Sequence, residues 1–233
     1  MSRHKPVSRF LWQASQKSTL FQWSKKNLKL ERAEMEMSML PLLTQHTKQY
    51  SADSSILEIG CGPVCISHSL PHKHKTYLDP LIDDFRRMFP GELPEDGEQL
   101  ACNAERINKE SNSYDIVICL NTLSFSMNPE LIVNEVERLL KPGGIFIVEM
   151  RTHSALEARL HYWLLRFLPR ITRSPRPYYY SLKGIRKTLE RHFYINSEQK
   201  LKKQILWLPF FKREQRLFVC TPQRKKAVAK SDL

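Results

Sequence analysis

The sequence predicts an α/β fold in which helices cover both faces of a mostly parallel β-sheet. Residues 56–67, I-L-E-I-G-C-G-P-V-C-I-S, run from an apolar strand into a glycine-rich turn. Residues 114–120, Y-D-I-V-I-C-L, form an apolar run of the kind shown by a central parallel strand with two buried faces. Residues 129–150 then give a helical pattern, a K-P-G-G stop and another strand. Alternating strand and helix signals of this kind are typical of a parallel sheet.

The first turn is suited to holding a small molecule against the backbone. Gly60 and Gly62 carry no Cβ atom and can adopt positive φ angles, so the chain can approach a ligand closely. Glu58 supplies a carboxylate as the strand ends. The turn does not fit the G-x-G-x-x-G fingerprint of dinucleotide-binding proteins, because Cys65 stands where the third glycine belongs. A buried strand and turn without a ligand is the alternative interpretation.

The string E-I-G-C-G-P resembles the first motif of class I S-adenosylmethionine-dependent methyltransferases, whose pattern is acid-x-Gly-x-Gly-x-Gly. Val64 departs from that pattern, because it occupies the last glycine position. The resemblance implies a small-molecule methyltransferase with S-adenosylmethionine as cofactor. It also implies a Rossmann-like three-layer sandwich with a seven-stranded sheet, parallel except for its last strand. In this turn it assigns cofactor binding to Glu58, Gly60, Cys61, Gly62 and Pro63.

A second strand, in H-K-T-Y-L-D-P-L, ends at Asp79 and Pro80, with Asp79 lying 21 residues beyond Glu58. In a βαβ unit this spacing places the Asp79 carboxylate beside the first turn, where it can accept hydrogen bonds from both ribose hydroxyls of an adenosine. An aspartate before a proline is also typical of a helix N-cap. The two roles are compatible, and Asp79 and Pro80 are predicted cofactor residues.

Two later segments extend the predicted cofactor site. Residues 99–107, Q-L-A-C-N-A-E-R-I, resemble the family's third strand and its adenine-contacting segment, with Asn in place of the usual Asp. The amide oxygen of that Asn can still accept a hydrogen bond from the adenine amino group. The strand at 114–120 ends on the carboxyl edge of the sheet, where ligands bind. The cofactor residues predicted here are Asn103, Ala104, Glu105, Leu120 and Asn121.

The most specific resemblance to this superfamily is the string L-L-K-P-G-G-I-F-I-V. Pro142 disfavours helical backbone at Lys141, and Gly143 or Gly144 can take the left-handed cap, so a helix over 129–140 should end there. The resemblance covers residues 54–150 and, more weakly, residues 177–222.

The rest of the predicted sheet lies near the C-terminus. Residues 182–192 have the pattern of an amphipathic helix, and residues 193–198 and 215–221 read as strands. Pro209 interrupts the apolar run between those strands, which favours a hairpin over a helical crossover. A hairpin would make the last strand antiparallel.

Composition favours one domain in a reducing, cytoplasmic setting. The chain has 233 residues with 41% hydrophobic content, enough for one sizeable core. Five scattered cysteines predict neither a disulfide framework nor a structural zinc site, and no metal site is expected. No apolar run is long enough to span a bilayer.

The predicted organisation is an N-terminal helical cap at 1–50, a methyltransferase domain at 51–222 with a lid at 151–181, and a basic disordered tail at 223–233.

Charge is divided unevenly along the chain. Residues 1–32 contain 8 basic (Lys, Arg) and 1 acidic (Asp, Glu) residue, a net charge of +7. Residues 33–150 contain 9 basic and 18 acidic residues, a net charge of −9. Residues 151–233 contain 20 basic and 5 acidic residues, a net charge of +15. An acidic core suits a sulfonium cofactor, and basic flanks attract anionic partners or a membrane surface. Solvated faces that keep the protein soluble are the alternative. A mitochondrial transit peptide in the acid-poor N-terminal segment is a less favoured reading.

The lid carries the candidate catalytic groups. Residues 153–168 are predicted to form a helix with an apolar side, followed by the basic loop P-R-I-T-R-S-P-R-P-Y-Y-Y. Apolar side chains with interleaved arginines could hold an amphipathic acid or a lipid, but for any individual residue a helix packed on the sheet and a solvated loop is the favoured interpretation. The acid–histidine pair that relatives often carry after the fourth strand is replaced here by Leu-Ser-Phe. The weak candidates for a base are His153, His161 and Tyr178.

Three functional hypotheses follow. The favoured one is methylation of a small or lipid-like metabolite, anionic or neutral, at oxygen, nitrogen or carbon. An RNA-directed methyltransferase is less favoured, because the chain lacks the N-P-P-Y, D-P-P-Y and Pro-Cys motifs of nucleobase-modifying enzymes, although basic flanks could bind RNA. A cofactor-binding regulatory protein without turnover is the third, motivated by Val64 and the missing acid–histidine pair.

Overall fold

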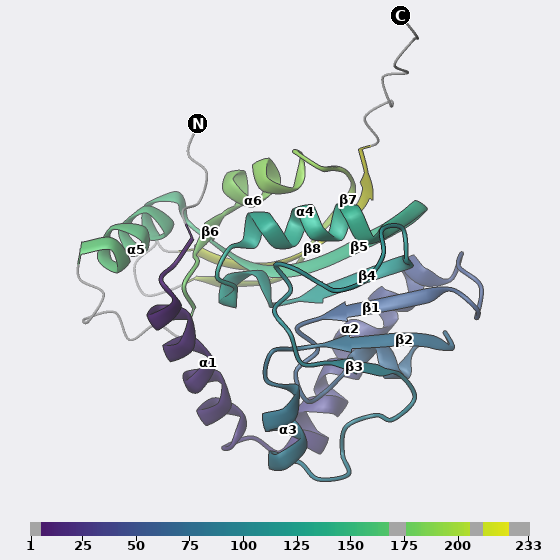
Figure 1. Ribbon diagram of the computed structural model, residues 1–233. Coiled ribbons are helices and arrows are strands. Elements are labelled where there is room, and N and C mark those ends of the chain that lie inside the picture. Colours follow the sequence, from purple (N-terminus) through teal and green to yellow (C-terminus); the bar gives the residue numbers. More distant parts are fainter. Residues whose placement is uncertain (1–5, 168–175, 206–211, 224–233) are drawn as a thin grey trace, which may run out of the picture.

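The computed structural model describes residues 6–167, 176–205 and 212–223. One mixed sheet of eight strands runs through the molecule, with helices on both faces (Figure 1). Seven strands follow the order β3-β2-β1-β4-β5-β8-β7, and the two-residue β6 pairs with β5 off this path. The strands are β1 Ser55–Ile59, β2 His74–Leu78, β3 Glu98–Leu100, β4 Tyr114–Leu120, β5 Leu140–His153, β6 Tyr180–Ser181, β7 Phe193–Ile205 and β8 Lys212–Pro222.

The pairing of these strands confirms the predicted mixed sheet. Strands β1 to β6 form only parallel pairs with one another, whereas β8 runs antiparallel to both β5 and β7. The hairpin prediction for the C-terminal strands is therefore correct, although residues 206–211 between them lie outside the described part of the chain. Strand β7 is longer than the predicted residues 193–198, because it pairs with β8 along nearly all of its length.

Helices pack on the two faces of the sheet through separate apolar clusters. On one face, α4 (Pro129–Leu139) and α6 (Leu182–Leu189) cover Val117, Phe146 and Val148. On the other, α2 (Leu28–Thr47) covers Ile116, Ile145 and Ile147. The alternation of side chains along β4 and β5 produces this split, because neighbouring residues of a strand point to opposite faces.

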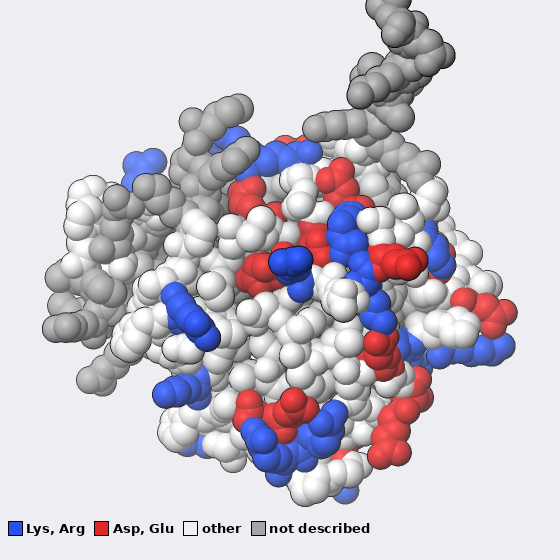
Figure 2. All heavy atoms as spheres, viewed as in Figure 1, with Lys and Arg blue, Asp and Glu red and all other residues white. Residues whose placement is uncertain are grey.

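Shorter or peripheral helices complete the described part of the fold. Helix α1 (Arg9–Trp23) runs past the ends of the strands, and α3 (Ile82–Met88) follows β2 (Figure 1). Single 3-10 turns, Ile66–Ser69 and Leu123–Phe125, follow β1 and β4. Acidic and basic side chains of α3 lie side by side on the surface in Figure 2. Helix α5 (Ala155–Phe167) continues directly from β5 into the predicted lid, of which residues 168–175 lie outside the described part.

The K-P-G-G segment behaves differently from the prediction. Helix α4 ends at Leu139, and Leu140 is already extended, so no glycine caps the helix. Gly143 does adopt a left-handed φ of +78°, but it lies inside β5, where the register with β4 is shifted between Tyr114 and Ile116. Gly143 therefore adopts its positive φ at an irregularity in the strand, which is another place where glycine is favoured.

Candidate cofactor and acceptor site

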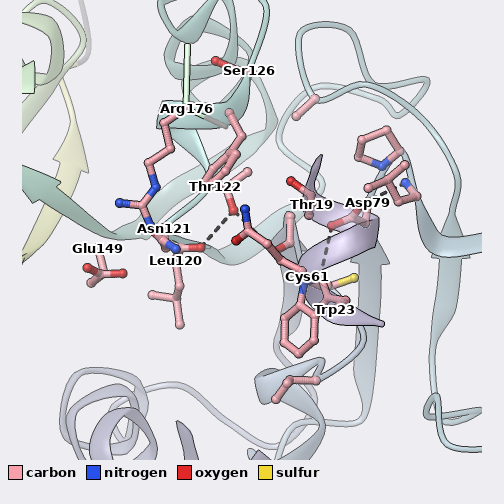
Figure 3. Close-up of a pocket in the computed structure, with 18 of the residues that line it drawn as sticks. Thr19, Trp23, Cys61, Asp79, Leu120, Asn121, Thr122, Ser126, Glu149 and Arg176 are labelled. Atoms are coloured by element: carbon pink, nitrogen blue, oxygen red, sulfur yellow. Dashed lines mark hydrogen bonds between the residues drawn. The ribbon is translucent and has the colours of Figure 1, made fainter. Parts of the chain in front are cut away.

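A cavity of about 440 Å³ opens at the carboxyl ends of β1, β2 and β4. Ligands of open α/β sheets bind in this position, at the ends of neighbouring parallel strands. The cavity continues past β4 to the C-terminal part of β5 and the N-terminal part of β8, and helices α1 and α2 contribute its outer wall. Figure 3 shows side chains from these separate segments converging on the cavity.

The glycine turn after β1 forms the floor of the cavity. Gly60 has a φ of +67° and Gly62 a φ of +55°, conformations that L side chains rarely adopt. The backbone N–H groups of Gly60 and Cys61 donate to the carbonyl oxygen of Leu78, at 2.7 and 3.2 Å, which ties the turn to β2. A Cβ atom on Gly60 would lie only 2.1 Å from Thr122 Oγ1. The turn therefore presents bare backbone to the cavity, as the sequence predicts.

Val64 does not need to be glycine in this chain. The left-handed residues of the turn are Gly60, Gly62 and Cys65, and Val64 is not among them. Its side chain is buried in the cluster beneath α2 and also borders the cavity. The departure from the family pattern is thus compatible with the backbone path of this turn.

Asp79 lies at the end of β2 with its carboxylate on the cavity wall. Its Oδ2 accepts a hydrogen bond from the Gly62 N–H at 3.1 Å, and its Oδ1 accepts from the Leu81 N–H at 2.8 Å. Burial raises the pKa of Asp79 to about 6, against the lowering effect of these two hydrogen bonds. The carboxylate thus links the glycine turn to the segment before α3. Asp79 lies beside the turn, as predicted, but it is not the N-cap of α3, because that helix begins at Ile82 with Leu81 as its N-cap.

Glu58 points away from the cavity. Its carboxylate accepts hydrogen bonds from the N–H groups of Ile66 and Ser67, at 3.2 and 2.9 Å, and from Ser67 Oγ at 2.5 Å. Burial raises the pKa of Glu58 to about 7. Neither Glu58 nor Pro63 is among the residues that line the cavity. Glu58 therefore shapes the glycine turn from behind, and direct cofactor contact by these two residues stays a prediction.

The remaining predicted cofactor residues all border the cavity: Cys61, Pro80, Asn103, Ala104, Glu105, Leu120 and Asn121. Glu105 also accepts hydrogen bonds from the N–H groups of Met127 and Asn128, at 2.8 and 3.1 Å, which fixes the loop after β4. Asn121 has a φ of +53°, and its N–H donates to the Glu149 carbonyl oxygen at 2.8 Å. The sheet thus brings together residues that are up to 60 positions apart, from 61 to 121.

The N-terminal helices close the cavity from outside. Trp23 of α1 lies over the glycine turn, 3.7 Å from the position of a Cβ atom on Gly62, and its ring meets Phe85 edge-on. Gln16 Nε2 donates to the Phe125 carbonyl oxygen at 3.4 Å, and the Val7 N–H donates to Met127 O at 3.1 Å. These contacts hold α1 and the residues just before it against the loop that follows β4.

Comparison with known proteins identifies the domain that carries this site. Residues 57–148 match the family model of a methyltransferase domain. The fold is similar to that of an S-adenosylmethionine-dependent methyltransferase from Methanosarcina mazei, with 20% identity, a TM-score of 0.56, and coverage of 76% of this chain and 95% of the other. Residues 57–148 therefore form a methyltransferase domain, in agreement with the resemblance seen in the sequence.

Two further structures share the methyltransferase's fold. A proposed methyltransferase from Bacillus halodurans gives a TM-score of 0.62 at 14% identity, with 79% of this chain and 98% of the other covered. A protein from Pyrococcus horikoshii gives 0.60 at 20% identity, with 83% and 91% covered. No curated protein matches the sequence.

The cavity of this methyltransferase fits its cofactor, S-adenosylmethionine. Gly60 and Gly62 leave bare backbone for a close approach, the Asp79 carboxylate can accept from ribose hydroxyls, and Asn103 can accept from an adenine amino group. When bound, the cofactor supplies a methyl group activated by its sulfonium. Asp79 and Asn103 would hold the adenosine, and Asn121 follows β4, which lies next to β5 in the sheet.

The three candidate bases lie outside the cavity wall. His153 and His161 enclose the Tyr179 ring in a stack, with centroid distances of 3.9 and 3.7 Å. Burial lowers the pKa of each histidine to about 4. The Tyr178 hydroxyl donates to Met127 O at 2.8 Å and accepts from the Val7 N–H at 3.1 Å, and burial raises its pKa. Their catalytic role stays a prediction, and the geometry favours a structural role for all three.

Other cavity residues are absent from the sequence prediction. Thr122 Oγ1 donates to Leu120 O at 2.9 Å and stands against Gly60. Glu149 and Arg176 line the far end of the cavity (Figure 3), and Arg151 also borders it. One sequence signal pointed to Glu149, because an acid inside the apolar strand I-F-I-V-E-M is unusual for a buried strand. Arg151 and Arg176 carry no comparable local signal, since only the fold brings them to the cavity.

Proposed function

We propose that this methyltransferase acts on a small or lipid-like metabolite that enters the cavity beside the cofactor. The observation that carries the proposal is that the cavity continues beyond the cofactor residues to the C-terminal part of β5 and the N-terminal part of β8, while α1 and α2 wall it from outside. A volume of about 440 Å³ lies within the range typical of small-molecule sites, roughly 300–1,000 Å³. In the transfer, the bond from sulfur to the methyl carbon breaks as the bond to the acceptor atom forms. Positioning of the acceptor supplies much of the acceleration.

Radiolabelled S-adenosylmethionine tests this proposal. The full chain is incubated with a cell extract, and label is then measured separately in the organic-soluble, water-soluble small-molecule, RNA and protein fractions. The proposal expects label in one of the small-molecule fractions. Label confined to RNA would instead establish an RNA-directed enzyme. Cofactor binding without label in any fraction would support a regulatory protein, and either of these two outcomes would overturn the proposal.

Matched charge reversals make the assay specific. Asp79→Arg should abolish labelling, because it removes the carboxylate at the cavity wall and places a cation beside a sulfonium. Asp53→Arg is the control, since the Asp53 side chain is 71% exposed and lies away from the cavity wall. Equal labelling by the two variants would show that the product does not come from this site.

We also propose that α5 rests against an anionic lipid surface. Leu156, Leu160, Trp163 and Phe167 form a helical stripe whose side chains are all roughly half exposed. The only acid of α5, Glu157, is buried and paired with Arg213, with Arg213 Nη2 2.7 Å from its Oε1. An apolar stripe without exposed acids is complementary to anionic headgroups over hydrocarbon.

Vesicle sedimentation measures this contact. Vesicles of equal parts phosphatidylglycerol and phosphatidylcholine should carry the protein down, and Trp163→Ser with Phe167→Ser should reduce the bound fraction severalfold. Leu131→Ser on α4 is the matched control, because Leu131 is also an exposed apolar residue, 47% accessible, on another helix. Equal loss in the control, or self-association of the protein in place of vesicle binding, would contradict the proposal. Among the described residues, no helix has the length and apolar character needed to cross a bilayer.

A further inference from the structure

The last residue of α1, Trp23, covers the glycine turn with an aromatic ring. The ring lies 3.7 Å from the position of a Cβ atom on Gly62. It meets the Phe85 ring of α3 edge-on, with the two centroids 6.2 Å apart. Trp23 also packs against two apolar clusters, one that includes residues of α2 and one that includes residues of α3. The ring is therefore held in the cavity wall by contacts with three separate segments.

The ribose that Asp79 can accept determines where the sulfur of the cofactor lies. In S-adenosylmethionine the sulfur is bonded to the 5′ carbon of the ribose whose hydroxyl groups would face this carboxylate. Asp79 Oδ2 itself accepts a hydrogen bond from the Gly62 N–H at 3.1 Å. A ribose held by Asp79 thus brings the sulfur close to the glycine turn, which Trp23 covers. Figure 3 shows Trp23, Cys61 and Asp79 at the same end of the cavity.

The Trp23 ring already attracts a positive charge in this structure. Lys26 Nζ stands over the ring, 4.7 Å from its centroid, and both residues line the cavity. An aromatic face attracts a cation within about 6 Å, because its π electrons make the face negative. The Lys26 ammonium is also paired with Glu31, with Nζ 2.6 Å from Oε2. This pairing offsets the charge of Lys26, so it repels a second cation in the cavity only weakly.

Helix α1 has no carboxylate with which to hold a cation, because its sequence contains no acidic residue. The residues of α1 that line the cavity are aromatic or uncharged and polar: Trp12, Gln16, Thr19, Gln22 and Trp23. Of these, Trp23 is the residue that lies against the glycine turn. Its aromatic face is therefore the means by which α1 can stabilise a positive charge at the turn.

We propose that the indole face of Trp23 binds the sulfonium of S-adenosylmethionine and makes the site prefer this cofactor over its product, S-adenosylhomocysteine. The sulfur of the product is a neutral thioether, so the negative face of the ring does not attract it as a cation. Trp23 is thus a specificity-determining residue for the cofactor, and it favours replacement of the product by fresh cofactor after each transfer. The inference goes beyond the proposed function, because it holds for any methyl acceptor.

The ratio of two affinities tests this proposal without a methyl acceptor. The full chain is titrated in a calorimeter with S-adenosylmethionine and, separately, with S-adenosylhomocysteine. Trp23→Leu should lower the affinity for S-adenosylmethionine about three- to tenfold more than the affinity for S-adenosylhomocysteine, since it removes a cation–π contact. Trp23→Phe keeps an aromatic face and should retain most of the preference. Equal losses of both affinities in Trp23→Leu would assign the ring a packing role alone and would overturn the proposal.

Fluorination separates recognition of charge from packing, and it decides the matter if Trp23→Leu fails to fold. Difluorotryptophan has nearly the shape of tryptophan but a less negative face, so its incorporation should reduce the preference for S-adenosylmethionine. The same incorporation into Trp23→Phe, which keeps the other tryptophans, should leave the preference of that variant unchanged. An unchanged preference in the fluorinated unmodified protein, or an equal fall in both proteins, would contradict the proposal.

Phe21→Leu is the matched control on the same helix. Phe21 is 61% exposed and also lies beneath a lysine, with Lys25 Nζ 4.0 Å from its ring centroid, but it stands outside the cavity wall. The variant should bind both ligands as the unmodified protein does. A loss of preference equal to that of Trp23→Leu would count against a specific role of Trp23. Failure of the unmodified protein to bind either ligand would instead refute the cofactor site itself, and the proposal with it.

Discussion

Thr122 occupies the space that a side chain on Gly60 would need. A Cβ atom on Gly60 would lie 2.1 Å from Thr122 Oγ1 and 2.3 Å from its Cγ2. The contact joins the glycine turn after β1 to the loop after β4, and Thr122 Oγ1 also donates to the Gly60 carbonyl oxygen at 3.3 Å. Two of the segments that form the cofactor cavity are therefore fitted to each other as well as to a ligand.

The first prediction concerns this contact. Gly60→Ala should destabilise the protein by about 2–4 kcal/mol, through left-handed strain at φ +67° and the clash with Thr122. In a Thr122→Gly background the clash is absent, so the same change should cost only about 1–2 kcal/mol. Urea unfolding of the four proteins of this double-mutant cycle measures the difference. Equal costs in both backgrounds would show that Thr122 does not restrict the turn.

Cofactor affinity should fall at acidic pH because of Asp79. The folded-state pKa of Asp79 is about 6, so its carboxyl group is protonated in a growing fraction of the molecules below that pH. The protonated group is a poorer acceptor of hydrogen bonds from ribose hydroxyls than the carboxylate is. The affinity for S-adenosylhomocysteine should therefore be constant above neutral pH and fall by up to about tenfold per pH unit below 6. Calorimetric titration over this range gives the profile. The Asp79→Asn variant should bind S-adenosylhomocysteine weakly, and its affinity should depend less on pH. If the affinity of this variant depended on pH as that of the unmodified protein does, another group would be responsible for the titration.

The Asp96 network should matter more for stability than other ion pairs on the surface. Lys75 Nζ lies 2.9 Å from Asp96 Oδ2, and the Lys75 side chain is only 6% exposed. Burial raises the pKa of Asp96, but hydrogen bonds from Lys75, His68 and Tyr77 outweigh it and lower the pKa to about 2. Asp96→Ala leaves a buried ammonium with less compensation and should cost about 2–3 kcal/mol.

The pH dependence and a control define this prediction further. Because the pKa of Asp96 is depressed, its contribution is present above its ordinary pKa near 4 and is lost as the pH falls toward 2. The matched change Asp53→Ala removes an exposed pair with Lys73 and should leave the unfolding midpoint unchanged. A similar loss in both variants would show that burial of Lys75 carries no special cost.

The stacked histidines should make the protein sensitive to acid. Both His153 and His161 have pKa values lowered to about 4 by burial, below the unfolded value of about 6.5. The unfolded chain therefore binds more protons between these values, and stability is lost as the pH falls from 6.5 toward 4. His161→Gln should flatten the decline of the melting temperature over this range. An equally steep decline in the variant would mean that other groups govern acid unfolding.

Local sequence was sufficient wherever the decisive contacts are close along the chain. The glycine turn, the end of β2 at Asp79 and the helix–strand pair α4–β5 follow from spacing and residue type, because periodicity, positive φ and strand ends are local properties. Local rules wrongly predicted that a glycine of the K-P-G-G segment caps helix α4. The left-handed Gly143 instead lies inside β5, because the pairing register between β4 and β5 depends on residues that are distant in the sequence.

The sequence by itself determined the methyltransferase domain, the mixed sheet and most residues of the cavity wall beside the glycine turn. Only the tertiary structure decided that Glu58 braces the turn from behind, that His153 and His161 stack on Tyr179, and that α1 walls the cavity. It also decided that Glu149, Arg151 and Arg176 meet at the far end. The physical reason is that a strand pattern fixes which side chains share a face, whereas their neighbours from other segments depend on pairing register and helix packing across the whole chain.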